Sequence, residues 1–167
     1  MTGPAPNGRA AERVEMRSLP FAAPESVTLI TELMADLARR YGGTGDDTPI
    51  AAADFQPPRG DFLVAFLDGK PVGCGAWRTF AGAEGVAEIK RMYVVPALRG
   101  TGLARAVLAG VEDSARKAGC HRAILETGEA QPEALAFYRK AGYRPIEDFG
   151  HYKDKPGVRS FGRDLDA

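Results

Sequence analysis

The chain has 167 residues, of which 44% are hydrophobic and 26% are charged. This size and balance are typical of one globular domain with a buried core, and they exclude a disordered chain or a disulfide-stapled miniprotein. Basic and acidic residues number 22 each, so the formal net charge is zero. No overall field attracts nucleic acid or an acidic membrane surface, and charged ligands must be held locally.

The sequence shows no membrane span, no signal peptide and no cysteine pattern. The longest strongly apolar run, Phe62 to Leu67, is far shorter than the roughly 20 residues of a membrane span, and the N-terminus does not resemble a signal peptide. Cys74 and Cys120 are too few for a disulfide scaffold and lack the spacing of a metal site. We therefore expect a cytoplasmic protein without membrane contact or bound metal. Residues 1–12 are predicted to be a flexible tail and residues 13–167 a single domain.

The first half of the domain begins with a predicted strand at 14–18 and a helix from Pro24 to about Gly42, in which apolar residues recur at helical spacing. The proline- and aspartate-rich segment 44–59 predicts a loop with about one helical turn, and we expect it to line a substrate site. Strands are predicted at 62–67 and 71–80, because Asp68-Gly69 between them is a strong hairpin signal.

The second half alternates strands and helices. A strand at 86–95 is closed by Pro96, and a strongly amphipathic helix follows from Gly100 to Gly119. Further elements are predicted as a strand at 121–127, a helix at 133–141, and strands at 143–149 and 157–165. This order predicts an α/β fold with a mixed, mostly antiparallel sheet of about seven strands and helices on both faces.

The loop between the strand at 86–95 and the long helix is the most informative segment. Gly100 and Gly102 let the backbone turn tightly, and the unpaired N–H groups of the first helical turn favour an anion such as phosphate. A nucleotide triphosphate loop would need Gly-Lys-Ser or Gly-Lys-Thr, and a dinucleotide fingerprint would place a third glycine where Arg105 stands. Neither fits, although a glycine turn that merely starts a helix remains an alternative.

Two segments resemble the signatures of one family. Arg99-Gly-Thr-Gly-Leu-Ala104, preceded by Met92-Tyr-Val-Val-Pro96, resembles the pyrophosphate loop of the GNAT superfamily of N-acetyltransferases. Gln131 to Tyr143 resembles the family's second signature, a short helix with a tyrosine before a Gly-aromatic step. The resemblance extends over roughly residues 62–165, whereas residues 14–59 fit the family only in pattern.

The resemblance implies how acetyl-CoA, the co-substrate, would bind. Backbone amides of Arg99, Gly100, Thr101, Gly102, Leu103 and Ala104 would hold the pyrophosphate, and the main chain of Met92, Tyr93 and Val94 would pair with the pantetheine arm. The acetyl group would then lie where the strands at 86–95 and 121–127 splay apart, with a backbone N–H near Met92 polarising its carbonyl. Gln131 stands where relatives often have an asparagine that contacts the cofactor.

The catalytic residues are also assigned through the resemblance. Tyr138 occupies the position of the acid that protonates the departing thiolate, and a phenol can donate without being ionised. An amine with a pKa near 10 needs a base. Glu126 resembles the base of the branch that acetylates ribosomal-protein N-termini, and Glu88 that of the histone-acetylating branch. Each glutamate has a structural alternative as the partner of an arginine, and we rank Glu126 slightly ahead.

The resulting prediction is an enzyme that transfers acetyl directly from acetyl-CoA to a primary amine, most readily of a small molecule, within a ternary complex. Covalent transfer through a cysteine is disfavoured because neither cysteine has a candidate base at useful spacing. The alternatives are a protein lysine or N-terminal acetyltransferase, and a non-catalytic acyl-CoA-binding module. The resemblance also allows a homodimer, for which the sequence itself shows no interface signal.

Overall fold

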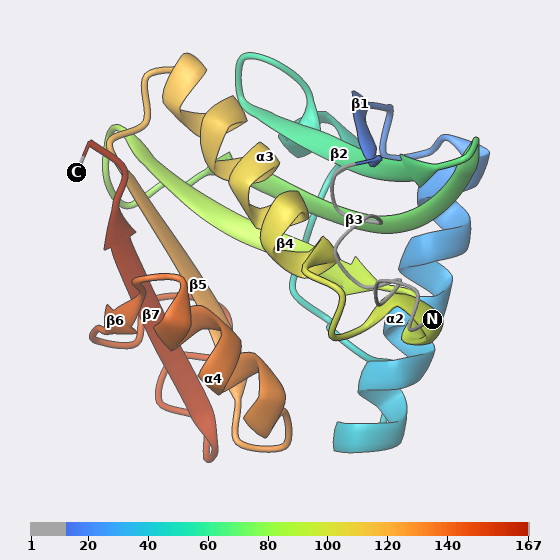
Figure 1. The fold of residues 1–167 in the computed structure, drawn as a ribbon. Helices are drawn as coiled ribbons and strands as arrows, with labels where there is room; N and C mark the ends of the chain where they lie inside the picture. The colour runs from blue at the N-terminus through green and yellow to red at the C-terminus, as the bar shows by residue number, and fades with distance from the viewer. Residues whose placement is uncertain (1–12, 167) are drawn as a thin grey trace, which may run out of the picture.

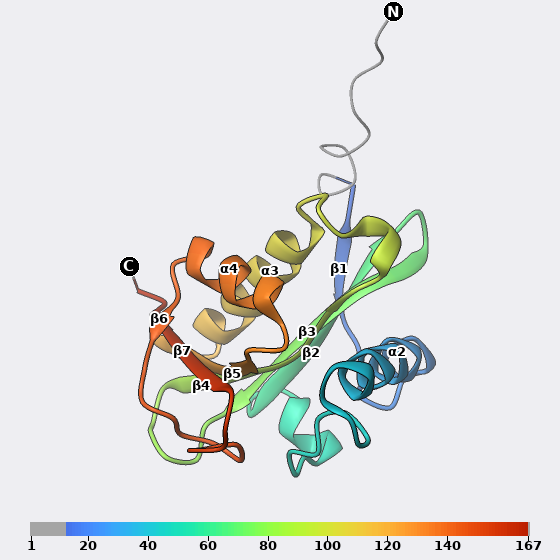
Figure 2. The same cartoon turned by 90° about the horizontal axis from the view of Figure 1, so that it is seen from below.

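The computed structural model describes residues 13–166, which form a central sheet with helices packed on both of its faces (Figures 1 and 2). The predicted tail at 1–12 lies outside the described residues. The helices and strands, in chain order, are β1 (Glu15–Ser18), α2 (Pro24–Tyr41), η1 (Ala52–Phe55), β2 (Gly60–Leu67), β3 (Lys70–Thr79), β4 (Val86–Val94), η2 (Pro96–Leu98), α3 (Leu103–Lys117), β5 (Arg122–Gly128), α4 (Pro132–Lys140), β6 (Arg144–Pro145) and β7 (Val158–Asp164).

Within the described range the sheet has seven strands in the order β1-β2-β3-β4-β5-β7-β6. Every neighbouring pair is antiparallel except β4 and β5, which are parallel. The predicted mixed, mostly antiparallel α/β fold is therefore confirmed. No helix in this part of the chain is long and apolar enough to cross a membrane.

Two hydrophobic cores form because β2 alternates its side chains between the two faces of the sheet. Leu63 and Ala65 pack into the core under α3, whereas Phe62, Val64 and Phe66 belong to the core under α2. Figure 2 shows α2 on one face and α3 with α4 on the other. The continuous apolar run of β2 is thus explained by burial on both sides, as in a central strand.

The parallel pair β4 and β5 is joined only at its beginning. Pairing runs from Val86 opposite Arg122 to Glu88 opposite Ile124, and no further. In Figure 1 the two strands diverge beyond this point. The predicted splay is therefore present, and it leaves the second half of β4 without a strand partner on its β5 side.

A β-bulge lies in the same half of β4. Cys74 pairs with Tyr93 and Ala76 pairs with Lys90, so Arg91 and Met92 together face Gly75. Arg91 adopts a φ of 61°, and its carbonyl accepts a hydrogen bond from the Cys74 thiol at 3.2 Å. A bulge bends its strand and redirects neighbouring side chains. Here it acts at the point where β4 leaves β5.

One predicted strand is wrong in extent. Residues 143–149 were expected to be extended throughout, but β6 contains only Arg144 and Pro145. Pro145 has no N–H to donate to a ladder. Asp148 then turns the chain, because its carboxylate accepts hydrogen bonds from the Ser160 hydroxyl at 2.8 Å and from the Asp154 N–H at 3.2 Å. The segment that follows is a loop that crosses the end of β5.

Candidate active site

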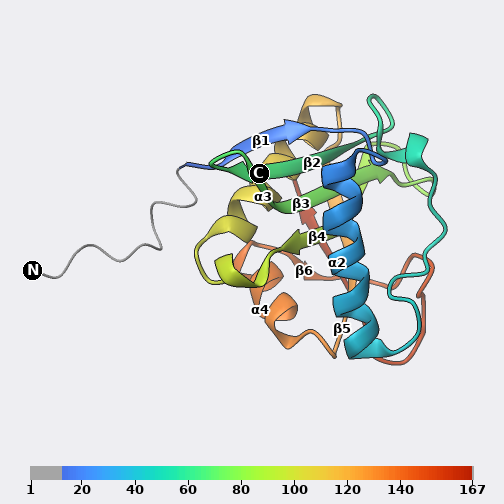
Figure 3. The ribbon, with the colours of Figure 1, turned by 90° about the vertical axis from the view of Figure 1, so that its right-hand side faces the viewer.

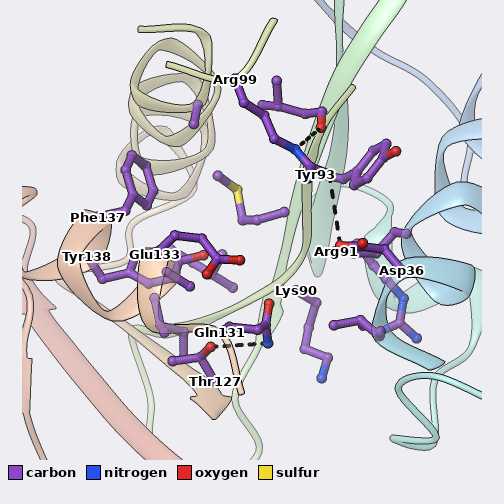
Figure 4. A pocket seen from close by; sticks show the side chains of 18 of the residues that line it. Asp36, Lys90, Arg91, Tyr93, Arg99, Thr127, Gln131, Glu133, Phe137 and Tyr138 are labelled. Atoms are coloured by element: carbon purple, nitrogen blue, oxygen red, sulfur yellow. Dashed lines mark hydrogen bonds and ion pairs between the residues drawn. The ribbon is translucent and has the colours of Figure 1, made fainter. Parts of the chain in front are cut away.

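The gap between the splayed strands contains a cavity of about 470 Å³. Its walls come from α2, the second half of β4, the loop after Pro96, the end of β5 and the first turns of α4. Figure 4 shows Phe137 and Tyr138 of α4 on one side of this cavity and Tyr93, Asp36 and Lys90 on the other. The cavity therefore lies where the sequence predicted the acetyl group and the cofactor arm.

The glycine loop forms one end of the cavity. Gly100 and Gly102 have φ values of 79° and 88°, and α3 begins at the next residue without a side-chain cap. The first N–H groups of α3 have no intrahelical partner, and N–H groups at a helix start are suited to binding an anion. Among the predicted pyrophosphate-loop residues, those that line the cavity are Arg99, Gly100, Gly102 and Ala104.

Two members of the predicted loop face elsewhere. The side chain of Leu103 is completely buried in the core under α3. Thr101 donates its hydroxyl to the Leu98 carbonyl at 2.5 Å, which holds the loop in its turn. Any contact of these two residues with a ligand must therefore come from the main chain, as the resemblance implies.

Met92, Tyr93 and Val94 line the cavity along the half of β4 that has no β5 partner. Arg99 donates its Nε–H to the Val94 carbonyl at 3.2 Å, and its guanidinium lies 5.7 Å from the centre of the Tyr93 ring. A carbonyl oxygen has two lone pairs, so Val94 can accept a second hydrogen bond. This edge can receive an extended amide-bearing chain as an additional strand.

Tyr138 lines the cavity from α4 and is 8% exposed. Its ring packs edge-on against Phe137 at 5.1 Å and against Tyr143 at 5.6 Å between centroids. Burial raises the pKa of Tyr138 far above its ordinary value. The phenol therefore stays protonated at neutral pH and can donate a hydrogen bond.

Glu126 lies at the end of β5 and lines the same cavity. One carboxylate oxygen accepts the Tyr152 N–H at 3.2 Å, and the other, Oε1, is buried without a hydrogen-bond partner in the described part of the chain. Burial raises the pKa of Glu126, although the positive charge of Lys90 and the Tyr152 N–H act in the opposite direction. A vacant, buried carboxylate oxygen is well suited to accept a proton.

Gly150 explains how the loop before β7 approaches Glu126 so closely. A Cβ atom at this position would lie 2.4 Å from Glu126 Oε1 and 2.9 Å from its carboxyl carbon. Only a glycine leaves room for the carboxylate here. Sequence reasoning missed this contact, because residues 24 apart in the chain give no pattern that links them.

Glu88, the other candidate base, lies at the last position where β4 and β5 pair. It is 4% exposed, and its carboxylate accepts a hydrogen bond from Arg78 Nε at 2.9 Å within an ion pair. It is not among the residues that line the cavity. The structure thus separates the two glutamates, with Glu126 beside the cavity and Glu88 bonded to an arginine.

Gln131, which the second signature also singled out, lines the cavity at the start of α4. Its amide donates to the Tyr41 hydroxyl at 3.1 Å and to the Thr127 hydroxyl at 3.4 Å. The side chain therefore joins the end of α2 to the end of β5. It stands within reach of a ligand in the cavity.

A second, adjoining cavity of about 260 Å³ shares Glu126, Lys90 and Asp46 with the first. Its outer walls come from the end of α2 and from residues 152–158. From the loop at 44–59, which was expected to line a substrate site, Gly45 and Asp46 line this cavity. His151 is exposed, lies 3.0 Å from Asp47 and lines neither cavity.

Asp46 is the centre of a charge cluster that the sequence did not reveal. Its Oδ2 lies 2.8 Å from Lys90 Nζ and 2.6 Å from Arg91 Nη1, and its Oδ1 accepts hydrogen bonds from Thr48 and Tyr152. Burial alone would raise the pKa of Asp46, but Lys90 and the Thr48 hydrogen bonds outweigh it and hold that pKa well below its ordinary value. The adjacent Asp46-Asp47 pair was the only available signal in the sequence.

An ion pair crosses from α2 to α4 beside the larger cavity. Arg40 Nη1 lies 2.5 Å from Glu133 and donates to the Ala130 carbonyl at 3.1 Å. Asp36 and Arg40, both on α2, line the cavity with Glu133. The segment that matched the predicted family only in pattern thus supplies an entire wall. Among residues 13–166, no three metal-ligating side chains are grouped as in a metal site.

Comparisons with known proteins agree with this geometry. Residues 30–143 match the family model described as "Acetyltransferase (GNAT) family". An IAA acetyltransferase of Azospirillum brasilense is 43% identical over 95 residues, which are 57% of this chain and 61% of that protein. The uncharacterized N-acetyltransferase YjgM of Escherichia coli is 29% identical over 127 residues, or 71% of this chain and 76% of that protein.

A solved structure supports the same conclusion. A Klebsiella pneumoniae protein assigned as an acyl-CoA N-acyltransferase superposes with a TM-score of 0.75 and 29% identity, covering 91% of this chain and 97% of that one. The family model spans more than half of the chain, and it includes the glycine loop, β5 and α4. The chain therefore belongs to the acetyltransferase (GNAT) family.

Proposed function

We propose that the protein transfers an acetyl group from acetyl-CoA to the primary amine of a small molecule, by direct attack within a ternary complex. The observation that carries this proposal is the vacant, buried Oε1 of Glu126 at the boundary between the two cavities. The larger cavity offers the helix start of α3 for a pyrophosphate and the unpaired half of β4 for an amide chain. The smaller cavity provides space for the acceptor amine. The name of the Azospirillum relative favours a small acceptor.

The chain's own groups fit the co-substrate. Free N–H groups at the start of α3 and the glycines before it would hold the pyrophosphate, and the unpaired edge of β4 would receive the pantetheine amides. Bound there, acetyl-CoA supplies the activated acetyl group. Positioning of this kind lowers the entropic cost of bringing the acceptor and the thioester together.

Proton transfer is assigned to two side chains. Glu126 would accept the proton of the acceptor amine, directly or through a water molecule, because an amine with a pKa near 10 is protonated at neutral pH. Tyr138 would donate a hydrogen bond or proton to the departing thiolate, since its buried phenol remains protonated. The backbone N–H near Met92 would polarise the acetyl carbonyl. Glu88 is engaged by Arg78 and serves this proposal less well.

The test is a panel of acceptors with acetyl-CoA, read by release of free coenzyme A thiol and by mass spectrometry of the acetylated product. Amino acids, polyamines, aminoglycosides and peptides cover the main classes of amine. We expect release with small amines. Release with peptides alone would assign a protein-modifying enzyme, and tight binding of acetyl-CoA without release by any amine would favour a non-catalytic binding module.

A further inference from the structure

Two charged groups of opposite sign line the smaller cavity, one of them buried and the other exposed to water. One is Glu126 Oε1, which is buried without a partner. The other is the ammonium of Lys155, at the outer wall, which has no carboxylate within ion-pair distance among residues 13–166. Its Nζ lies 5.3 Å from the centre of the Tyr152 ring, its one recorded polar interaction. The two groups mark the two positions at which a bound molecule can form polar contacts.

Asp46 also lines this cavity, but it cannot serve a ligand as a free anion. Both of its oxygens are occupied by hydrogen bonds or ion pairs with Lys90, Arg91, Thr48 and Tyr152. One carboxylate there neutralises two cations and leaves a surplus of positive charge. Lys90 is 8% exposed and Arg91 6%, so water screens this surplus weakly.

The formal charges of the cavity and of the cluster behind it can be counted. Lys90, Arg91 and Lys155 are positive, whereas Asp46, Asp47 and Glu126 are negative, so the formal charges balance. Asp47 accepts a hydrogen bond from the Tyr152 hydroxyl and does not line the cavity, so Lys155 is the charged group that a ligand meets at the outer wall. The Lys155 ammonium repels a second ammonium group on the ligand and attracts a carboxylate, which favours an acceptor with one anionic group.

The apolar walls of the smaller cavity suit a short carbon chain that extends from Glu126 to Lys155. Leu37, Tyr41, Pro156 and Val158 contribute apolar surface to the cavity. Its volume of about 260 Å³ suits a small molecule rather than a folded protein segment. A methylene linker would cover this apolar surface while its two polar ends meet Glu126 and Lys155.

We infer that the acceptor is a primary amine that carries a carboxylate, bound with its amine at Glu126 and its carboxylate at Lys155. The inference rests on the proposed function, because it names the substrate class of the same site. It assigns Lys155 as a specificity-determining residue that touches the far end of the acceptor and takes no part in the acetyl transfer.

The test compares acceptors of matched length: 4-aminobutyrate, butylamine and 1,4-diaminobutane, with the three- to six-carbon members of each series. We expect kcat/KM for the best aminocarboxylate to exceed that of its alkylamine by about 3- to 10-fold, the range for a partly exposed ion pair, with the diamine lowest. Lys155→Ala should bring the aminocarboxylate-to-alkylamine ratio to about one, and Lys155→Glu should place the diamine first.

Lys153→Ala is the matched control, because Lys153 is an exposed lysine of the same loop that lines neither cavity. It should keep the wild-type ratio. Equal rates for the three acceptor classes in the wild type, or a preference unchanged in Lys155→Glu, would overturn the inference while leaving the transferase in place. Absence of thiol release with every amine would instead overturn the proposed function, and this inference with it.

Discussion

At the scale of single residues, burial raises the pKa of both proposed catalytic side chains, Tyr138 and Glu126, but their neighbours differ. Tyr138 packs against the rings of Phe137 and Tyr143, and burial raises the pKa of its phenol. Glu126 is pressed against Gly150 but keeps one oxygen vacant. Burial favours the neutral form of both groups. One is therefore held as a donor, and the other binds a proton more readily than an exposed glutamate.

Glu126→Gln should lower kcat about 10²- to 10⁴-fold, the usual size of general base catalysis. The raised pKa of Glu126 means that the wild-type carboxylate becomes protonated, and activity declines, as the pH falls through a value above the ordinary one of about 4.3. This acidic limb in the pH profile of kcat/KM should disappear in Glu126→Gln and persist in Glu88→Gln. A limb that survives in both variants would point to water or another residue as the base.

Tyr138→Phe should lower kcat by roughly 10- to 1000-fold with little change in the affinity for acetyl-CoA, because it removes a proton donor but keeps the ring. Tyr143→Phe is the matched comparison. Tyr143 is buried beside Tyr138 and donates to Glu112 at 3.0 Å, so its loss should lower stability by about 1–3 kcal/mol and leave kcat in place. Stopped-flow turnover and urea unfolding separate the two effects. An unchanged kcat in Tyr138→Phe would remove Tyr138 from the mechanism.

At the scale of elements, the junction of the glycine loop with α3 should determine cofactor binding. Gly102→Glu places a bulky anion at the helix start where phosphate is expected, and calorimetry should show a loss of acetyl-CoA affinity of at least about 100-fold. Gly119→Glu, at the other end of α3, is the control. Both glycines have positive φ, so both variants carry a similar backbone cost of about 1–2 kcal/mol. Tight binding by Gly102→Glu would refute the loop assignment.

The loop before β2 is fastened to β4 through Asp46. Asp46→Ala leaves Lys90 and Arg91 without their shared carboxylate and should lower the free energy of unfolding at pH 7 by about 2–4 kcal/mol. Because the pKa of Asp46 is depressed on folding, this contribution is present above the unfolded value of about 4 and is lost as the pH falls toward the folded value. The difference between wild type and variant should therefore shrink in acid.

Glu15→Ala provides the baseline for that measurement. Its ion pair with Arg17 lies on the surface, where water screens it, so its loss should change the free energy of unfolding far less than the loss of Asp46. Urea titrations of wild type, Asp46→Ala and Glu15→Ala at pH 7 and in acid would measure these differences in the free energy of unfolding. If Asp46→Ala behaved like Glu15→Ala at pH 7, the charge cluster would contribute nothing to the stability of the site.

At the scale of the whole molecule, the larger cavity lies between the two halves of the sheet, at the one parallel pair of strands among those described. A ligand that fills the gap should stabilise the entire fold. Acetyl-CoA at about 100 times its dissociation constant adds about 2.7 kcal/mol by mass action, which corresponds to a rise in Tm of about 5–10 °C for a chain of this size. Scanning fluorimetry should show this rise in the wild type, whereas no rise would contradict cofactor binding. Gly102→Glu should show none.

The views in Figures 2 and 3 make clear how much of this arrangement is non-local. α2, which runs along one face of the sheet, supplies a wall of a cavity whose opposite wall is α4. The periodicity of α2 predicted the helix but not which of its residues are buried, because Leu29 and Leu33 are buried whereas Val27 is 49% exposed. It also gave no sign that Asp36 and Arg40 would face the site. Such contacts depend on how elements far apart in sequence pack, and no local pattern encodes that packing.

The sequence by itself determined the order of elements, the α/β class and the glycine loop, because periodicity, turn residues and short motifs act over a few neighbouring positions. Glu126 and Tyr138 were singled out by the resemblance to the GNAT family. Only the tertiary structure distinguished the surroundings of the two candidate bases. It placed Gly150 against Glu126 and Arg78 against Glu88. It also brought Asp46, Lys90 and Lys155 to one cavity. Desolvation and charge pairing depend on distances in space, and these are fixed when the chain has packed.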